Sequence, residues 1–212
     1  MPLGSSISES QCKKDCTRRA IAGFDMRAFR LVKRRKGNTM NFKGQEVYFD
    51  RDDLIVSKTD RDGRLTYINH TFLDVSDYQE EDVIGKQHNV IRHENMPRAI
   101  FESLWTTIKS GKEIFAYVVN STKHGDHYWV MAHVTPSRDG NQIVGYHSTR
   151  RTPNPNTIKN VIVPLYDRLS AIESRNPSKK AGLEESVAEL NSMLAEKNVS
   201  YDEFIADLKK DD

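Results

Sequence analysis

The residues whose side chains are best suited to bind a ligand lie between His88 and Trp105. Two histidines, an arginine and an asparagine precede Pro97, which suits the first position of a helix because the N–H it lacks would have no intrahelical partner there. Apolar residues then recur at spacings of one, three and four: Ile100, Phe101, Leu104, Trp105 and Ile108. A cationic cluster beside an apolar stripe suits a pocket for an anionic, planar ligand, although an ordinary capped helix would show the same pattern.

The residues around this stretch predict a sheet that could position it. Two strands precede it, separated by a tight turn at Asp60–Gly63, and three strands in a meander follow it. The expected strands are 54–56, 64–68, 114–120, 127–136 and 143–149. Short helices lie between the second and third strands. This order predicts an α+β fold with an antiparallel sheet and helices on one face.

The first 43 residues form a basic arm. They contain eleven Lys or Arg and three acidic residues, so the arm carries +8 and the rest of the chain −6. Apolar residues recur at helical spacing from Thr17 to Lys36, after ten small and polar residues that we expect to be disordered. A solvated or loosely docked helix fits this pattern, and so does a basic amphipathic helix that attaches to an anionic membrane or to nucleic acid.

Several classes of protein are excluded by composition. Cys12 and Cys16 are the only cysteines, so they cannot form a disulfide framework, and without further ligands their spacing is no zinc pattern. The chain has no run of about 18 apolar residues and no secretory signal at its start, so we expect no transmembrane segment. A reducing, cytoplasmic location is the simplest expectation.

Residues 153–212 differ from the preceding part. Pro153 and Pro155 end the sheet pattern, and amphipathic helical stripes follow on both sides of a linker at Asn176–Ser178. Ser200 can cap a last helix, with Glu203 at the matching position of a capping box. We expect these helices to serve in docking or dimerisation.

A series of short motifs follows in a recognisable order across residues 53–151. The motifs are Thr59, Gly63, Tyr67 to Asn69, Thr71 and Phe72, Val75 and Ser76, Tyr78, Gly85, His88 and Asn89, Arg92 and His93, Met96 and Pro97, Phe101, Leu104 and Trp105, Gly111, Gly125 to Val130, Pro136, and Gly145 and Tyr146. Together they make this part resemble a PAS domain, and more narrowly the sensory PAS domain of bacterial aerotaxis receptors. The resemblance implies a PAS fold with a five-stranded antiparallel sheet, short helices on one face, and flanking N- and C-terminal helices.

The resemblance also implies a cofactor and its site. This family binds FAD non-covalently and reports the redox state of the flavin to a signalling partner. Carried over residue by residue, the implied cofactor-binding residues are Asn69, Arg92, His93, Asn95, Trp105, Asn120 and Trp129. The two amides Asn69 and Asn120 would serve the pyrimidine edge of the flavin, and Arg92 an anionic group. His93 could respond to that charge, because the pKa of histidine lies near physiological pH.

The chain departs from the family pattern at several of these places. Asn95 stands where an acidic residue is usual, Ile114 replaces a tryptophan, Ala116 replaces a glycine, and the basic run after Asn120 is reduced. Loss of a stacking tryptophan and of cations favours a rival interpretation, a PAS module without cofactor that acts as a protein-interaction adaptor.

Other chemistries have less support. Some PAS domains hold haem through one histidine, but His93 lies outside the helix expected to supply it. His124, His127 and His133 lack carboxylates at ligand spacing, so we expect no metal site. Residues 88–93 contain no cysteine, which excludes the adduct of photosensing flavin domains. No nucleophile–base pair or nicotinamide-binding turn appears, so we expect no enzyme.

The sequence therefore predicts three parts and one function. Residues 1–43 are the basic arm, 44–152 a PAS sensor domain and 153–212 a helical extension. We predict a cytoplasmic signalling module that senses redox state or oxygen through FAD. Its partners would be a signalling protein or a second copy, contacted through the flanking helices. Nucleic acid is not expected as a partner, and the basic arm leaves peripheral membrane contact open.

Overall fold

A single sheet organises the structure. The computed structural model describes residues 33–35 and 42–210, which belong to one compact unit. Five strands lie in the spatial order β4-β3-β7-β6-β5, and each neighbouring pair is antiparallel. Their bounds are β3 (Ile55–Asp60), β4 (Leu65–Ile68), β5 (Ile114–Ser121), β6 (His127–Asp139) and β7 (Gln142–Arg151). The predicted α+β fold with its five-stranded antiparallel sheet is confirmed.

Two further strands extend this sheet. β2 (Glu46–Tyr48) runs parallel to the start of β6, and β1 (Lys33–Arg35) pairs antiparallel with β2. The expected helix over 17–36 is therefore wrong for residues 33–35, where pairing with the edge of β2 prevails over the local helical spacing. The remainder of that predicted helix, the first ten residues and both cysteines lie outside the described residues.

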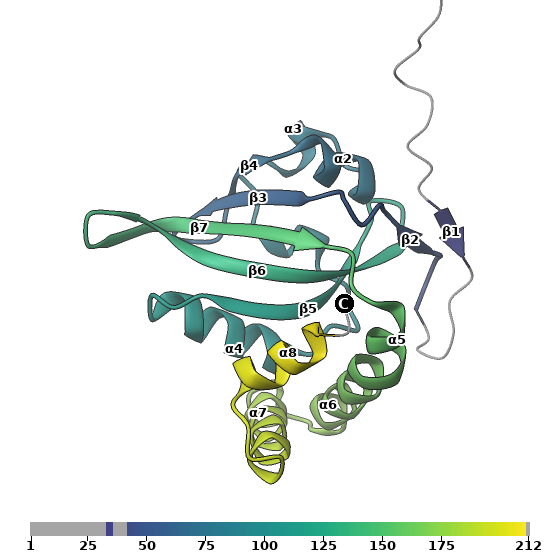
Figure 1. Ribbon diagram of the computed structural model, residues 1–212, viewed down its shortest axis with the longest axis vertical. Coiled ribbons are helices and arrows are strands. Elements are labelled where there is room, and N and C mark those ends of the chain that lie inside the picture. Colours follow the sequence, from purple (N-terminus) through teal and green to yellow (C-terminus); the bar gives the residue numbers. More distant parts are fainter. Residues whose placement is uncertain (1–32, 36–41, 211–212) are drawn as a thin grey trace, which may run out of the picture. The chain divides into compact units, whose positions relative to one another are not determined.

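Short helices connect β4 to β5. They are α2 (His70–Ser76), α3 (Glu80–Val83), η1 (His88–Ile91) and α4 (Arg98–Lys109). Pro97 occupies the N-cap position of α4, whereas the sequence pattern predicted it at the first helical position, one residue later. Gly85 follows the C-cap of α3 with a φ of 78°, in the left-handed conformation that glycine adopts without strain. Figure 1 shows α2 and α3 near one edge of the sheet and α4 near the other, by β5.

Helices of the C-terminal extension follow the sheet and pack both on its face opposite α4 and on α4 itself. They are α5 (Pro155–Thr157), η2 (Ile158–Ile162), α6 (Val163–Arg175), α7 (Lys179–Glu196) and α8 (Tyr201–Lys209). The Tyr166 hydroxyl on α6 donates to the backbone oxygen of Tyr117 at 2.5 Å, and its ring lies 6.0 Å from that of Trp129. Lys209 of α8 lies over the ring of Phe115. The expectation of short helices on one face of the sheet, with flanking C-terminal helices, is thus confirmed.

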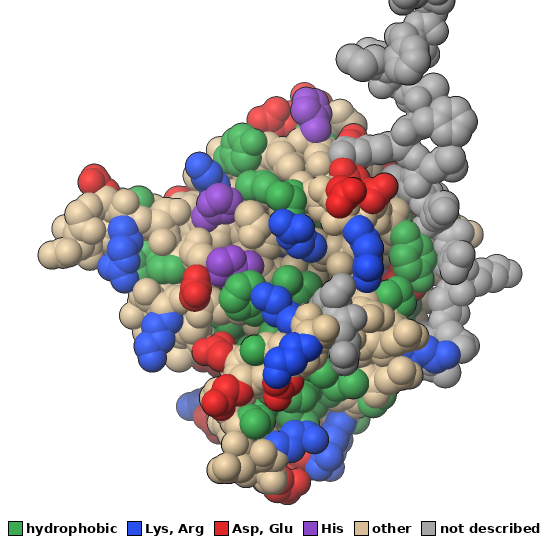
Figure 2. All heavy atoms as spheres, viewed as in Figure 1, with side chains coloured by type: hydrophobic (Ala, Val, Ile, Leu, Met, Phe, Trp, Pro, Cys, Tyr) green, Lys and Arg blue, Asp and Glu red, His purple; other side chains and the backbone are tan. Residues whose placement is uncertain are grey.

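The outer surface of this helical extension is charged. Arg168 pairs with Glu189, and Arg175 with Glu185, so ion pairs join α6 to α7. The lower part of Figure 2 shows acidic and basic side chains next to one another there. The predicted capping box of Ser200 and Glu203 is present at the start of α8. Among the helices that the structure describes, none is both long and apolar enough to span a membrane.

Candidate functional site

A cavity of about 550 Å³ lies between α4, η1 and the sheet. Its size is within the usual range for small-molecule sites. The apolar part of its wall consists of Phe101, Leu104, Trp105, Ile108, Val118, Ala132 and Val134. The polar part includes Ser57, Thr59, Gln87, His88, Asn89, Arg92, Asn120, Ser148 and Arg150. The rim carries the exposed side chains of Arg61, Asp62, Glu102 and Lys109.

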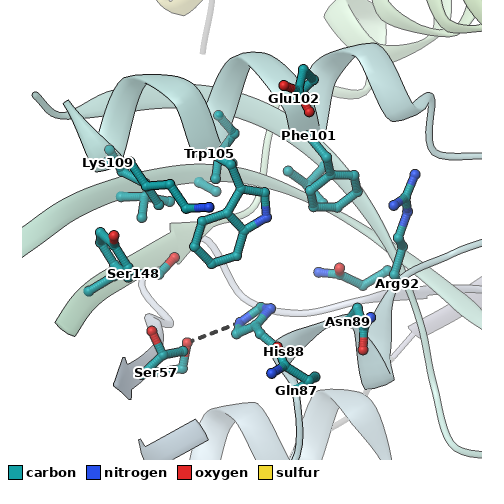
Figure 3. Close-up of a pocket in the computed structure, with 18 of the residues that line it drawn as sticks. Ser57, Gln87, His88, Asn89, Arg92, Phe101, Glu102, Trp105, Lys109 and Ser148 are labelled. Atoms are coloured by element: carbon teal, nitrogen blue, oxygen red, sulfur yellow. Dashed lines mark hydrogen bonds between the residues drawn. The ribbon is translucent and has the colours of Figure 1, made fainter. Parts of the chain in front are cut away.

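Trp105 forms one wall of this cavity. Its ring points from α4 into the cavity on the side that faces His88, as Figure 3 shows. Tyr146 of β7 contacts the indole edge to face, with centroids 5.6 Å apart and an interplanar angle of 84°. A planar indole held by a second aromatic ring gives a flat apolar surface on which a ligand ring can lie.

Arg92 lines the cavity, but its guanidinium already has protein partners. Nη2 donates to the backbone oxygen of Met96 at 3.0 Å, and the guanidinium carbon lies 4.2 Å from the centre of the Phe101 ring. Burial lowers the pKa of Arg92, an effect that the negative charge of Glu173 opposes. The side chain therefore supports the cavity wall as well as contributing charge to it.

Asn120 presents a free donor to the cavity. The residue is 3% exposed and lies on the face of β5 that also carries Val118. Its amide nitrogen has no hydrogen-bond partner among the described residues. Because buried polar atoms are almost always paired, such an atom in a cavity wall indicates a ligand-binding role.

A buried polar network lies on the sheet side of the cavity. Arg150 Nη2 donates to Ser57 Oγ at 3.0 Å and to His88 Nε2 at 2.5 Å. Ser57 Oγ and His88 Nε2 are 3.3 Å apart, an interaction drawn in Figure 3. Burial, and secondarily the charge of Arg150, lower the pKa of His88 to about 3. Burial also lowers the pKa of Arg150 to about 10.

Sequence reasoning missed most of this network. It placed His88 in the polar cluster before Pro97, but it did not single out Ser57 or Arg150. One signal was available: Arg150 shares the face of β7 that carries Tyr146 and Ser148, because side chains two residues apart lie on the same face of a strand. Because arginine is rarely buried without a specific partner, an arginine on the buried face of a strand indicates a specific role.

Asn69 and Trp129 are predicted site residues that do not line the cavity. Asn69 caps α2: its Oδ1 accepts from the backbone N–H groups of Phe72 and Val56, and its Nδ2 donates to the backbone oxygen of Leu54. Trp129 lies on the other face of β6, where it packs on Tyr166. Their roles in this structure are in capping and in core packing.

His93 and Asn95 also lie outside the cavity wall. His93 is 3% exposed and contacts the rings of Phe42 and His127 at 5.1 and 5.8 Å. Burial lowers its pKa to about 4. Asn95 donates its backbone N–H to His93 Nδ1, and its backbone oxygen accepts from Ser170 of α6. The structure therefore brings Arg92, Trp105 and Asn120 together and separates the other four predicted residues from them.

Histidines and acidic residues do not gather into a metal centre in the part of the chain that the structure describes. No group of three or more His, Cys, Asp or Glu side chains there could hold an ion. His133 instead pairs with Glu113 at 2.9 Å and stacks on Phe115.

Part of this chain is similar to known proteins. A family model described as PAS fold matches residues 65–150. The aerotaxis receptor of Escherichia coli (strain K12) is 38% identical over 120 residues, which are 57% of this chain and 24% of the receptor. Phototropin-2 of Oryza sativa subsp. japonica is 24% identical over 78 residues, 37% of this chain and 9% of that protein. The chain therefore matches about a quarter of the first relative and about a tenth of the second.

A solved structure of similar fold is the light state of the blue-light photoreceptor Aureochrome1 LOV. Its TM-score is 0.48 at 18% sequence identity, over 52% of this chain and 89% of that one.

Proposed function

Because the chain carries a PAS domain over residues 65–150, we propose that it is a sensory module that binds a flavin, FAD, in the cavity under α4. One observation carries this proposal. Four of the eight buried side-chain atoms without a hydrogen-bond partner among the described residues belong to residues that line the cavity: Thr59 Oγ1, Asn120 Nδ2, Ser148 Oγ and Arg150 Nη1. Such atoms in an enclosed site suit the hydrogen-bonding edge of a bound heterocycle.

The chemistry of the wall fits a flavin. Trp105 and Phe101 offer aromatic surfaces to a planar ring, and Val118 with Ala132 offers an apolar floor on the sheet. Asn120 can donate to a carbonyl oxygen of the ring edge. When bound, a flavin supplies reversible uptake of electrons and protons, while the residues of this chain orient it and exclude water.

Cations at the rim suit the pyrophosphate of FAD. Arg61 and Lys109 are exposed at the rim, which also carries Asp62 and Glu102. Arginine and lysine are the usual partners of phosphate oxygens. This charge is the reason for proposing FAD and not a flavin without phosphate.

Contacts of α4 connect the cavity to the C-terminal helices. Glu173 of α6 accepts from the backbone N–H groups of Arg98 at 3.1 Å and Ala99 at 3.0 Å, and from Arg98 Nε at 2.9 Å. Leu183 of α7 lines the cavity itself. We propose that reduction of the flavin changes how α4 packs on α6 and α7. The ligand can bias this packing only through different affinities for two arrangements.

The proposal also includes a signalling partner and a cellular location for the module. The similarity to an aerotaxis receptor supports signalling, through the C-terminal helices, to a partner protein or to a second copy of this chain. We place the module in the cytoplasm and assign it no catalytic reaction of its own.

A cofactor-free adaptor is the second candidate. The observation that favours it is Ile114, which is 2% exposed and stands on β5 where the family has a stacking tryptophan. In this case the cavity would be a packing defect and the helices alone would be functional.

Flavin binding by the purified full chain separates the two candidates. We expect the visible spectrum of a bound flavin after reconstitution with FAD, and weaker binding of riboflavin. Trp105→Ala and Asn120→Ala should each weaken FAD binding at least tenfold, about 1.4 kcal/mol. The exposed Asn141→Ala should leave binding unchanged and serves as the control for Asn120→Ala.

A cooperatively folded protein that stays colourless with excess FAD would favour the adaptor. Steady consumption of NADH by the flavin-loaded protein would instead indicate an enzyme.

A further inference from the structure

Arg150 is a buried cation whose partners are all neutral. It is 4% exposed and lines the cavity. Its Nη2 donates to Ser57 and His88, while Nη1 is buried without a hydrogen-bond partner in the described part of the chain. None of the ion pairs between described residues includes Arg150.

This arrangement costs stability in the free protein. A buried charge is normally paired with an opposite charge, because removal from water is expensive for a lone ion. Ser57 and His88 accept hydrogen bonds, but they bring no negative charge. They hold the guanidinium in place and leave both its charge and one of its nitrogens available to a ligand.

The other cations of the cavity wall are less available. Arg92 is engaged with Met96 and Phe101, and the charge of Arg98 is neutralised by Glu173 at 2.9 Å. Lys109 is exposed at the rim, where water screens its charge. Arg150 is therefore the buried cation whose charge the described part of the protein leaves uncompensated.

We propose that Arg150 is the counter-charge for an anionic edge of the ligand in the cavity, and that His88 and Ser57 are its positioning residues. The inference rests on the proposed function and names the ligand state that the site prefers, a flavin ring carrying one negative charge. The family resemblance assigned the contact with an anionic group to Arg92, whereas the geometry assigns it to Arg150.

The expected consequence is a more positive reduction potential. Two electrons from a reductant such as dithionite and one proton from solvent convert the neutral oxidised ring into a reduced ring with one negative charge. A buried guanidinium stabilises that charge more than it stabilises the neutral ring. It therefore increases the affinity for the reduced form relative to the oxidised form.

Substitution of Arg150 by Met tests this in the full chain loaded with FAD. We expect Arg150→Met to lower the preference for the reduced form at least tenfold, which is a shift of about −30 mV for a two-electron couple. Arg150→Lys, which keeps the charge, should recover part of the shift. Arg151→Met is the matched control, because the neighbouring arginine is exposed on the other face of β7.

A second readout needs no flavin. Removal of an uncompensated buried charge should leave the melting temperature of the flavin-free protein unchanged or raise it, as expected for a residue kept for binding and not for folding. Failure of Arg150→Met to fold, or a lower melting temperature than that of Arg151→Met, would assign Arg150 a structural role and overturn the inference.

The flavin measurements have equally distinct outcomes. A wild-type chain that binds no flavin would overturn the proposed function and this inference with it. A wild-type chain that binds FAD with a potential that Arg150→Met shifts no more than Arg151→Met does would overturn this inference alone.

Discussion

Acidification should destabilise this protein through the part-buried His88 and the buried His93. Burial lowers the pKa of His88 to about 3 in the folded state, whereas an unfolded histidine titrates near 6.5. Between these two values the unfolded chain binds more protons than the folded one, so the free energy of unfolding falls as the pH falls. The stabilising difference is fully present above about pH 6.5 and is lost progressively below it. His93, with a pKa of about 4, acts in the same direction.

The loss of stability due to His88 follows from the difference between the pH and the pKa of an unfolded histidine. At pH 5 an unfolded histidine is about 1.5 pH units below its pKa, and each unit corresponds to about 1.4 kcal/mol, so His88 contributes a loss of about 2 kcal/mol relative to pH 7.5. For a chain of this size, a loss of this order lowers the melting temperature by about 4–8 °C.

Thermal denaturation followed by circular dichroism at pH 7.5 and pH 5 measures this loss. His88→Gln removes the titrating group, and its amide oxygen can still accept from Arg150. We expect its loss of stability between the two pH values to be about 2 kcal/mol smaller than that of the wild type. His124→Gln, at an exposed position, is the control for a histidine outside the core. If His88→Gln lost as much stability on acidification as the wild type, the assignment of His88 as a part-buried neutral acceptor would be refuted.

Two further substitutions test roles that the structure assigns to residues outside or beside the cavity. Asn69→Ala removes the cap of α2 and the bond to Leu54, so we expect a loss of about 2 kcal/mol in urea denaturation with FAD affinity unchanged within about twofold. A tenfold weaker affinity of Asn69→Ala for FAD would instead indicate that Asn69 belongs to the binding site. Glu173→Gln leaves Arg98 without its ion-pair partner and weakens the anionic cap on α4. It should cost about 1–3 kcal/mol, and a loss below about 0.5 kcal/mol in the same assay would contradict the proposed link between α4 and α6.

Local patterns in the sequence were sufficient for the fold. Alternation of apolar and polar residues and glycine-containing turns predicted the five antiparallel strands, and the stripe from Ile100 to Ile108 predicted α4. The order of short motifs indicated a PAS domain, which the family match over residues 65–150 confirms. These features could be read from the sequence because hydrophobic periodicity and turn residues act over a few neighbouring positions.

The composition of the cavity was only partly predictable. Of the predicted site residues, Arg92, Trp105 and Asn120 line it, but Trp129 lies on the other face of β6. Side chains alternate between the two faces of a strand, so the register between strands decides which residues meet at a site. That register is set by the packing of the whole sheet and is not visible in a local motif.

Long-range contacts decided the rest. The pairing of Lys33–Arg35 with β2 and the packing of α6 on Trp129 join parts of the chain that are far apart in sequence. The same holds for Arg150, which meets Ser57 and His88 only when β7, β3 and η1 come together. The sequence by itself determined the five antiparallel strands, α4 and the resemblance of residues 65–150 to the PAS fold. Only the tertiary structure decided which charges are buried without a partner, because burial and pairing are properties of the packed chain.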